Sequence, residues 1–188
     1  MSLVAIKVGG GLAAVPGALA RVGRGIARAA VARAVVVIPG GGPFADAVRE
    51  FDRVEGLSPG ASHWMAVLAM DQFAHALADR IPGAVLTDEP GEIGSLAGRG
   101  SAVVLAPARW LRAADVLPHE WGVTSDSLAA WIAGALDAER LVLVKPVGGA
   151  AEELVDPYFG RTLPAGLAWA CLGWEEIDRL EEVLRTAG

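Results

Sequence analysis

The chain has 188 residues, of which 53% are hydrophobic and 20% charged, and its formal net charge at pH 7 is −6. This length and composition predict one globular domain with a sizeable core and exclude a disordered chain. The acidic balance argues against nucleic acid or an anionic membrane surface as the main partner, because either would require a basic excess.

Targeting signals and cysteine pairs are not indicated by the sequence. Its apolar runs are broken before 18 residues, so no membrane span is expected, and the first residues lack the pattern of a signal peptide. Cys171 is the single cysteine, which excludes an internal disulfide and a cysteine-based metal cluster. These features predict a cytoplasmic enzyme or binding protein.

The first half of the chain alternates apolar runs with helical patterns. Residues 3–8 form a short β-branched run that ends at glycine, which predicts a buried strand. An alanine-rich helix is expected over residues 14–32 and a second buried strand over residues 34–39. A helix follows over residues 44–51, with Pro43 suited to its first turn.

The second half continues the same alternation of helices and apolar strands. We expect a long helix over residues 63–80 and, after a short strand, a glycine-rich connection to the next strand. The remaining expected elements are strands at 84–86, 102–106 and 140–144, a helix at 125–136 and a closing amphipathic helix at 173–186. We see no internal repeat.

Continuous apolar strands alternating with helices predict an α/β fold, a three-layer α/β/α sandwich with a mainly parallel central sheet. In such sheets ligands bind beyond the carboxyl ends of the strands. Lys7 and two glycine runs stand at strand ends. We therefore expect them to converge on one crevice.

The first glycine run, Gly9, Gly10 and Gly11, follows Lys7 directly. Glycines let backbone N–H groups approach a phosphate, and a nearby ammonium neutralises its charge. The order is not that of a P-loop, in which the lysine follows the glycines. The alternative is a tight strand-to-helix turn beside a solvated lysine.

The second run, Gly40, Gly41 and Gly42, separates a strand from a helix that has Pro43 in its first turn. The N-terminus of that helix directs free N–H groups and the positive end of its dipole into the loop. A loop that merely needs a positive φ is the alternative. Two such loops in one small domain predict an anion held between them.

The stretch LPHEWGVTSDSLAAWIAG holds polar residues at a helix start. Thr124 or Ser125 is expected to cap the helix, and Asp126 suits its first turn. Asp126 either serves only the helix or orients Lys7 or a metal ion. His119 is a candidate for the substrate pocket rather than a metal ligand, because no second histidine stands at ligand spacing.

The stretch LVLVKPVGG repeats the opening pattern of an apolar strand, a lysine and glycines, here Lys145, Gly148 and Gly149. Two strand-end lysines facing glycine loops suit phosphoryl transfer, which is catalysed mainly by positioning and by neutralising charge. The alternative for Lys145 is a solvated strand end. No general base is obvious, which favours an acceptor that is already an ionised phosphate or carboxylate.

Together these segments resemble the amino-acid kinase superfamily, which includes acetylglutamate, aspartate, uridylate and isopentenyl phosphate kinases. The family's opening Lys-x-Gly-Gly is matched by Lys7, Gly9 and Gly10, and its acceptor loop by Gly40 to Gly42. Its aspartate at a helix start is matched by Asp126. Within the superfamily, PGGGPFADAVR and LPHEWGVTSDSLAAWIA look most like the kinases of methanofuran biosynthesis, which phosphorylate (aminomethyl)furanmethanol phosphate.

The resemblance implies an ATP- and magnesium-dependent kinase of a small molecule. Lys7 would stabilise the transferred phosphoryl group, Asp126 would position Lys7, and Lys145 would supply a second positive charge. Gly9, Gly10, Gly11, Gly148 and Gly149 would bind nucleotide phosphates. The acceptor side would comprise Gly40, Gly41, Gly42, His119, Thr124 and Ser125, with no metal ligand assigned to the protein.

The sequence also departs from the family pattern. Gly11 stands where a serine is usual, and Lys145-Pro-Val-Gly-Gly replaces a Thr-Asp-Val-Asp-Gly type sequence. The domain, residues 1–188, is thus expected to have a shortened C-terminal nucleotide lobe, which Asp156, Tyr158 and Phe159 would line if they do not simply pack. This suggests a second hypothesis, a non-catalytic or partner-dependent ligand-binding or storage protein. The six tryptophans suggest a homo-oligomer.

Overall fold

The central sheet determines where every functional residue lies. The structure, a computed structural model, describes residues 2–185, and within them six strands form one sheet in the order β3-β4-β2-β1-β5-β6. All neighbouring strands in this part of the chain are parallel, as the uninterrupted apolar strands predict. The strands are β1 (Leu3–Val8), β2 (Ala34–Pro39), β3 (Val85–Thr87), β4 (Val103–Leu105), β5 (Arg140–Lys145) and β6 (Ala168–Gly173).

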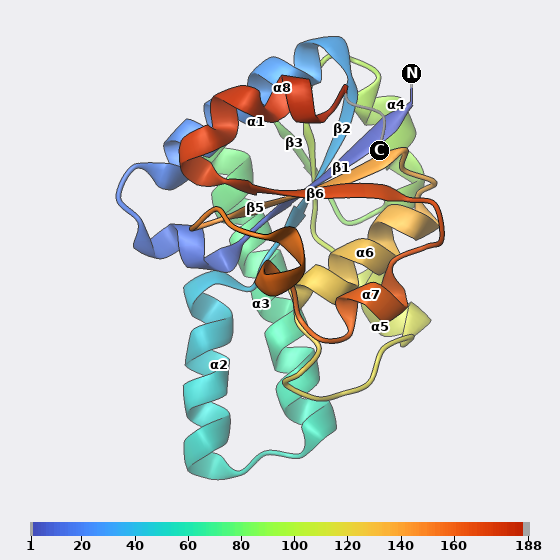
Figure 1. The fold of residues 1–188 in the computed structure, drawn as a ribbon. Coiled ribbons are helices and arrows are strands. Elements are labelled where there is room, and N and C mark those ends of the chain that lie inside the picture. Colours follow the sequence, from blue (N-terminus) through green and yellow to red (C-terminus); the bar gives the residue numbers. More distant parts are fainter. Residues whose placement is uncertain (1, 186–188) are drawn as a thin grey trace.

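Helices cover both faces of this sheet, so the predicted three-layer arrangement is confirmed (Figure 1). The α-helices are α1 (Ala18–Ala32), α2 (Gly42–Glu55), α3 (Pro59–Arg80), α4 (Ile93–Ala97), α5 (Ala108–Ala114), α6 (Ser125–Ala135), α7 (Phe159–Thr162) and α8 (Leu180–Val183). Short 3-10 helices are η1 (Gly10–Ala14), η2 (Pro90–Glu92), η3 (Ala151–Leu154) and η4 (Trp174–Arg179).

The two faces of the sheet hold separate hydrophobic clusters. Alternate residues of β1 face opposite ways, so Val4 and Ile6 pack with α1, η4 and α8, whereas Ala5 packs with α4, α5 and α6. Helix α3 contributes residues to both clusters, among them Phe73 to the first and Met70 to the second. The face that carries Ala5 is the one that leads to the site.

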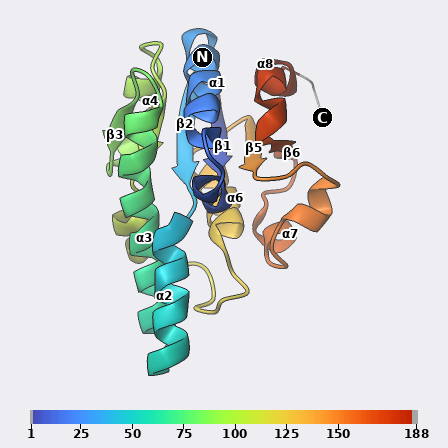
Figure 2. The same cartoon turned by 90° about the vertical axis from the view of Figure 1, so that its left-hand side faces the viewer.

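Helices α2 and α3 form an antiparallel hairpin that extends past the sheet (Figures 1 and 2). Ser58 caps α3 by accepting a hydrogen bond from the N–H of Ala61 at 3.3 Å, and Gly56 ends α2 in the left-handed conformation. Among residues 42–55, all of them described, Gly42 is the single buried member of α2. Most of α2 therefore forms a wall rather than a core element.

Several expectations need correction. The predicted closing helix over 173–186 is wrong within the described residues: Gly173 is the last residue of β6, and a 3-10 helix and the short α8 follow, while residue 186 lies outside them. Strand β6 was not predicted from the sequence, because its AWACLG run is only half-buried, at the edge of the sheet. The first α-helix begins at Ala18 rather than at residue 14, because Pro16 and Gly17 interrupt the chain.

Further short helices, α4, α5 and α7, were not expected, since none exceeds seven residues. None of the helices between residues 2 and 185 has the length and apolar character that crossing a membrane requires.

Candidate functional site

Two lysines project from adjacent strands toward the same helix. Lys7 lies on β1 two residues after Ala5, and Lys145 lies on β5 two residues after Leu143. Because side chains alternate along a strand, both lysines share the face on which Ala5 and Leu143 pack with α6. The first turn of α6, which contains Asp126, meets them there.

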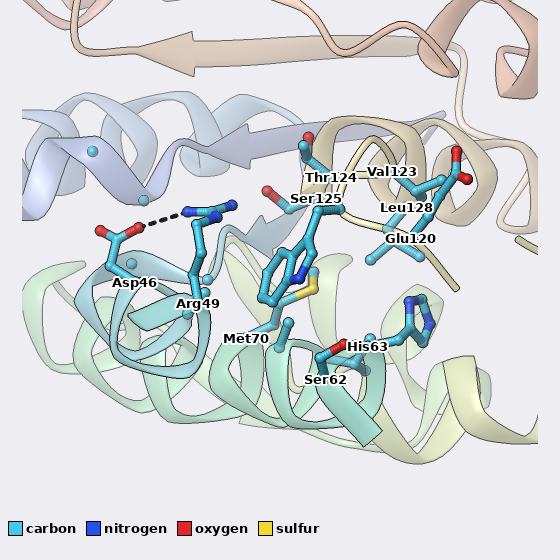
Figure 3. A pocket seen from close by; sticks show the side chains of 18 of the residues that line it. Asp46, Arg49, Ser62, His63, Met70, Glu120, Val123, Thr124, Ser125 and Leu128 are labelled. Atoms are coloured by element: carbon cyan, nitrogen blue, oxygen red, sulfur yellow. Dashed lines mark hydrogen bonds and ion pairs between the residues drawn. The ribbon is translucent and has the colours of Figure 1, made fainter. Parts of the chain in front are cut away.

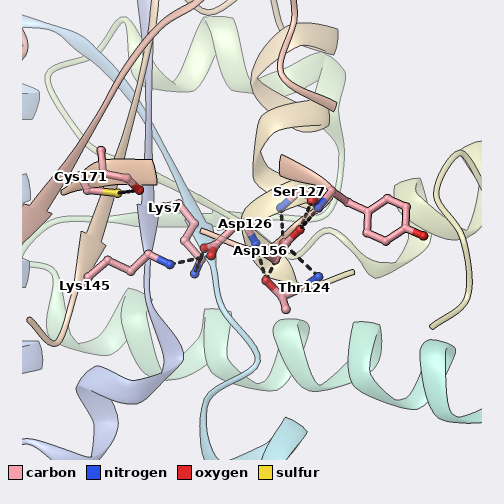
Figure 4. Close-up of polar contacts among 9 residues, drawn as sticks. Lys7, Thr124, Asp126, Ser127, Lys145, Asp156 and Cys171 are labelled. Carbon is pink, nitrogen blue, oxygen red and sulfur yellow. Dashed lines mark hydrogen bonds and ion pairs between the residues drawn. The ribbon is translucent and has the colours of Figure 1, made fainter. Parts of the chain in front are cut away.

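Asp126 binds both lysines at once (Figure 4). Its Oδ1 accepts a hydrogen bond from Lys7 Nζ at 2.7 Å, and its Oδ2 accepts one from Lys145 Nζ at 2.6 Å. The side chains of Lys7 and Lys145 are only 4% and 12% exposed. The solvated-lysine alternatives considered for both residues are therefore wrong.

The electrostatics of this cluster follow from burial and charge. Burial raises the pKa of Asp126, but the positive charges and hydrogen bonds of the two lysines outweigh it, so the pKa is lowered and the carboxylate stays ionised. Burial lowers the pKa of Lys7, the charge of Lys145 lowers it further, and Asp126 opposes both effects. Two ammonium groups thus share one carboxylate, which leaves the cluster ready to receive an anion.

The first turn of α6 is fixed by two oxygen-bearing side chains. Thr124 is the N-cap, and its hydroxyl accepts a hydrogen bond from the N–H of Asp126 at 3.2 Å. The buried carboxylate of Asp156 in turn accepts hydrogen bonds from the N–H groups of Thr124 and Ser127, each at 3.1 Å. Of the two expected caps, Thr124 is confirmed, and Ser125 instead lines the cleft described below.

The two glycine loops touch through their backbones. A Cβ on Gly10 would lie 2.4 Å from the backbone nitrogen of Gly42, so only glycine permits this approach. The N–H of Gly40 donates to the carbonyl of Val8 at 2.9 Å, which anchors the second loop to β1. Gly42 also has a positive φ of 58°, so the backbone alternative considered for this run is correct at that one position. The two loops thus converge as expected, whereas Lys7, which was expected in the same crevice, is buried and does not line the cleft described below.

A cleft opens where these loops meet the start of α6 (Figure 3). It measures about 820 Å³ including its open mouth, and Gly10, Gly11, Gly41 and Gly42 form one end of it. The first N–H groups of a helix have no partner inside it, and both runs stand at helix starts. The remaining lining residues are Ala45, Asp46, Arg49, Pro59, Ser62, His63, Ala66, Val67, Met70, Glu120, Trp121, Val123, Thr124, Ser125 and Leu128.

Arg49 is the cation of this cleft. Its guanidinium lies 4.8 Å from the centre of the Trp121 ring and 3.1 Å from a carboxylate oxygen of Asp46 (Figure 3). The Trp121 indole N–H also donates to Asp52 at 2.6 Å. These contacts join the segment before α6 to helix α2 across the cleft mouth.

A histidine pair stands at the rim. His63 lines the cleft, and His119 stacks on it with ring centres 4.2 Å apart and planes 12° apart. His119 also bonds Asp115 through Nε2 at 2.7 Å. Burial lowers the pKa of His63 and the charge of His119 lowers it further, whereas the charge of Asp115 raises it. The residue expected in the pocket, His119, thus lies behind His63.

Other candidate residues lie elsewhere. Gly9 donates its N–H to the carbonyl of Val144 at 2.8 Å and so ties the first loop to β5. Gly148 and Gly149 are exposed beyond the end of β5, where Gly148 faces Glu176, outside the residues that line the cleft. Phe159 is 1% exposed and packs on Trp169, so the packing interpretation holds for it.

Sequence reasoning missed several functional candidates. Arg49 and Asp46 stand three residues apart on α2, a spacing that places them on one helix face, and this signal was available. His63 and Glu120 come from distant segments and are joined only by the fold. Asp156 was considered for the nucleotide lobe, but the structure places it against α6.

No group of three or more His, Cys, Asp or Glu side chains that could hold a metal ion occurs within residues 2–185. The charged centre of the site is the lysine pair on Asp126.

Comparison with known proteins agrees with this geometry. The model of the amino acid kinase family matches residues 2–150. Over 115 residues the chain is 31% identical to [5-(aminomethyl)furan-3-yl]methyl phosphate kinase of Methanocaldococcus jannaschii, and the match covers 61% of this chain and 53% of that protein. The chain thus spans about half the length of this curated relative.

Solved structures share the fold. Uridylate kinase from Archaeoglobus fulgidus superposes with a TM-score of 0.60 at 22% identity, covering 80% of this chain and 66% of that one. UMP kinase from Bacillus anthracis superposes with a TM-score of 0.65 at 13% identity, covering 96% of this chain and 92% of that one. At these identities the likeness establishes the fold alone.

Proposed function

Since the chain belongs to the amino acid kinase family, we propose that it is an ATP-dependent kinase that transfers a phosphoryl group to a small molecule bearing a phosphate. The observation that carries the proposal is the pair of buried lysines on Asp126, where two glycine loops meet. Phosphoryl transfer needs positive charge and exact positioning more than it needs covalent chemistry, and this arrangement supplies both.

Lys7 and Lys145 are assigned to the phosphoryl group in transit. Asp126 holds both ammonium groups within 2.7 Å of its own oxygens, so their positions are set before any ligand arrives. Charge that is fixed in advance stabilises a transition state without the cost of reorganisation. Asp126 thereby acts as the positioning residue of the pair.

The residues present fit the phosphates of ATP, which supplies the group transferred. The N–H groups at the starts of η1 and α2 have no helical partners, and Gly11 is exposed at the cleft, where Gly10 and Gly41 are half-buried. Mg²⁺ commonly binds to nucleotide phosphates while keeping several waters, rather than in an all-protein cage. We therefore infer that magnesium enters with the nucleotide, and no step is assigned to a metal ligand of the protein.

Arg49 is assigned to the acceptor phosphate. A guanidinium binds phosphate through two parallel hydrogen bonds, and Arg49 stands over Trp121 at the side of the cleft. The relative from Methanocaldococcus jannaschii is named for a furan that carries both an aminomethyl and a phosphate group. In this cleft Asp46 and Glu120 offer carboxylates for an amine, and Val67 and Leu128 offer apolar surface for a ring.

The acceptor phosphate needs no general base. Its ionised oxygen would form a new bond to the γ-phosphorus of ATP as the bond from that phosphorus to the β,γ-bridging oxygen breaks, which gives a diphosphate and releases ADP. The sequence indicated no base, but His63, Asp46 and Glu120 all line the cleft. The preference for a phosphate over an alcohol therefore depends on Arg49 rather than on the absence of a base.

A homo-oligomer is also part of the proposal. Phe44, Phe51 and Val54 of α2 are exposed apolar residues, at 37%, 48% and 64%. Such residues are candidates for a contact between copies. Light scattering of the purified chain tests this, and a monomer at every concentration would refute it.

The function is tested by ³¹P NMR of purified protein with magnesium-ATP and a panel of acceptors. The panel contains [5-(aminomethyl)furan-3-yl]methyl phosphate, its alcohol without the phosphate, and a carboxylate of similar size. We expect diphosphate resonances with the phosphate acceptor and none with the alcohol. Binding of nucleotide without transfer to any acceptor would favour the non-catalytic or partner-dependent alternative instead.

A further inference from the structure

Asp156 is a buried carboxylate that the proposed chemistry does not use directly. It is 9% exposed and accepts five hydrogen bonds (Figure 4). Oδ2 accepts from the N–H and the hydroxyl of Thr124, at 3.1 and 2.7 Å, and from the N–H of Ser127 at 3.1 Å. Oδ1 accepts from the hydroxyl of Ser127 at 2.5 Å and from the N–H of Tyr158 at 2.9 Å.

The residues that donate these bonds at the start of α6 lie on both sides of Asp126 in the chain. Thr124 lies two residues before it and Ser127 one residue after it, and both are bound to the same carboxylate. The N–H of Asp126 itself is bound by the Thr124 hydroxyl. A negative charge at a helix N-terminus is further favoured by the helix dipole. The position and rotation of the first turn of α6 are thus fixed from outside the helix.

We propose that Asp156 is a positioning residue for phosphoryl transfer, which holds the first turn of α6 so that Asp126 presents one oxygen to each of the two lysines. The proposal rests on the proposed function, and it assigns Asp156 no contact with substrate. Because small displacements of catalytic groups lower rates steeply, a loosened α6 would slow transfer even with both lysines present.

Asp156 also joins two segments that face different parts of the site. It lies in the segment that follows β5 and its terminal lysine, whereas Thr124 lines the acceptor cleft. One carboxylate therefore ties the segment that follows β5 to the first turn of α6, which carries both the cleft-lining Thr124 and the lysine-binding Asp126.

The charge of Asp156 reaches Lys7 as well. The groups that act on Lys7 are Asp126 on α6, Lys145 on β5 and Asp156, and the charge of Asp156 raises the pKa of Lys7 against the effect of burial. Cys171 on β6 also faces this cluster, and burial raises the pKa of its thiol. Removing the charge of Asp156 should therefore move the titration of Lys7 to lower pH.

The test compares Asp156→Asn with Ser127→Ala. The asparagine side chain keeps the shape but loses the charge, and its NH₂ group faces donors that need an acceptor. The alanine removes one of the five bonds and keeps the carboxylate. Turnover is measured against pH with both substrates, and the titration of Lys7 is followed by NMR of ¹³C-labelled lysine, assigned with Lys7→Arg.

For Asp156→Asn we expect kcat to fall about tenfold to a hundredfold, with KM for both substrates within about twofold. The alkaline limb of the kcat profile and the Lys7 titration should both move to lower pH. Ser127→Ala should lower kcat severalfold and leave the alkaline limb in place. A wild-type kcat and Lys7 titration in Asp156→Asn would overturn the proposal.

The proposal is also overturned if kcat and KM change together in Asp156→Asn while the Lys7 titration stays in place, because Asp156 would then be merely structural. If the wild type transfers no phosphate, the proposed function fails, but the Lys7 titration still decides whether Asp156 acts on the cluster. If Asp156→Asn does not fold, Ser127→Ala carries the test: a lower kcat at unchanged KM supports the role, and a wild-type kcat overturns it.

Discussion

Lys7 and Lys145 reach opposite oxygens of one carboxylate, that of Asp126, from adjacent parallel strands, at 2.7 and 2.6 Å. Neighbouring strands bring two side chains of the same face close together, and α6 brings its first turn to the same point. The result is a buried cluster with more positive than negative charge among these three residues. Such a cluster favours an anion, and the function proposed above assigns it a phosphate.

Replacing Asp126 by asparagine should destabilise the fold. Two buried ammonium groups would lose their shared carboxylate, and removing one partner of a buried ion pair costs about 3–5 kcal/mol. Urea unfolding followed by circular dichroism measures this loss.

Asp178→Asn is the matched control for that experiment. Asp178 also bridges two cations, Arg21 at 3.1 Å and Arg28 at 2.8 Å, but all three side chains are at least 40% exposed. Exposed ion pairs contribute about 0–1 kcal/mol. Equal losses in the two variants would contradict the role assigned to burial at Asp126.

Replacing Arg49 by glutamine should raise KM for the phosphate acceptor about tenfold or more, because a charge-assisted bond to phosphate contributes roughly 1.5–3 kcal/mol. The KM for ATP should stay unchanged, since Arg49 lies on the acceptor side. Steady-state kinetics with each substrate varied in turn provides the measurement.

Arg53→Gln serves as the control for Arg49, because Arg53 lies one turn further along α2, paired with the exposed Glu50, and outside the residues that line the cleft. If both variants raise the KM for the acceptor by the same factor, the increase comes from the loss of positive charge on α2 in general and not from the loss of a specific contact between Arg49 and the acceptor.

Gly10→Ala should separate the two glycine loops. The added Cβ would lie 2.4 Å from the backbone nitrogen of Gly42, so a loop has to move. Overpacking of this kind costs about 1–3 kcal/mol, and turnover should fall with it. Thermal unfolding and kcat are measured together.

Gly94→Ala is the comparison for this substitution, because a Cβ there meets nothing within 4 Å and Gly94 lies in helix α4. Its stability should equal or exceed that of the wild type, since alanine favours helix. A Gly10→Ala protein as stable and active as Gly94→Ala would show that the contact between the loops is not needed.

Much of the fold could be predicted from the sequence, and the reason is local. Strands such as 3–8 and 34–39 are rich in β-branched apolar residues and are followed by glycines, so their type and bounds were correct. Strand β6 was missed because it is a half-buried edge strand, and the 3-10 helix after it was taken for part of an amphipathic helix because its sequence is rich in acidic residues.

The site residues also fall into those that the sequence could predict and those that it could not. Lys7, Asp126 and the two glycine runs could be found because each stands at the end of a strand or the start of a helix. The cleft wall could not, since His63 and Glu120 come together only when the segment before α6 folds over α3. The contacts of Asp156 with Thr124 and Ser127 were equally hidden, because these two partners lie about 30 residues earlier in the chain.

Acid should destabilise the protein partly through His63. Burial and then the charge of His119 lower the pKa of His63 below its unfolded value of about 6.5, although Asp115 opposes them. The unfolded chain therefore binds this proton first. The stability that His63 contributes is complete above pH 6.5 and is lost as the pH falls through its folded pKa.

His63→Gln should therefore show a shallower loss of stability between pH 7 and pH 5 than the wild type. Urea unfolding at a series of pH values measures both slopes. Identical slopes would show that His63 does not titrate as its burial against His119 requires.

The central claim is that Lys7 binds transferable phosphate, and calorimetric titration tests it most directly. A non-hydrolysable ATP analogue with magnesium is titrated into the wild type and into Lys7→Ala, in which Lys145 still neutralises Asp126. We expect binding to the wild type that weakens at least tenfold in the variant, because a charge-assisted bond is lost. Equal affinity in the two proteins, or no binding at millimolar analogue, would contradict the account.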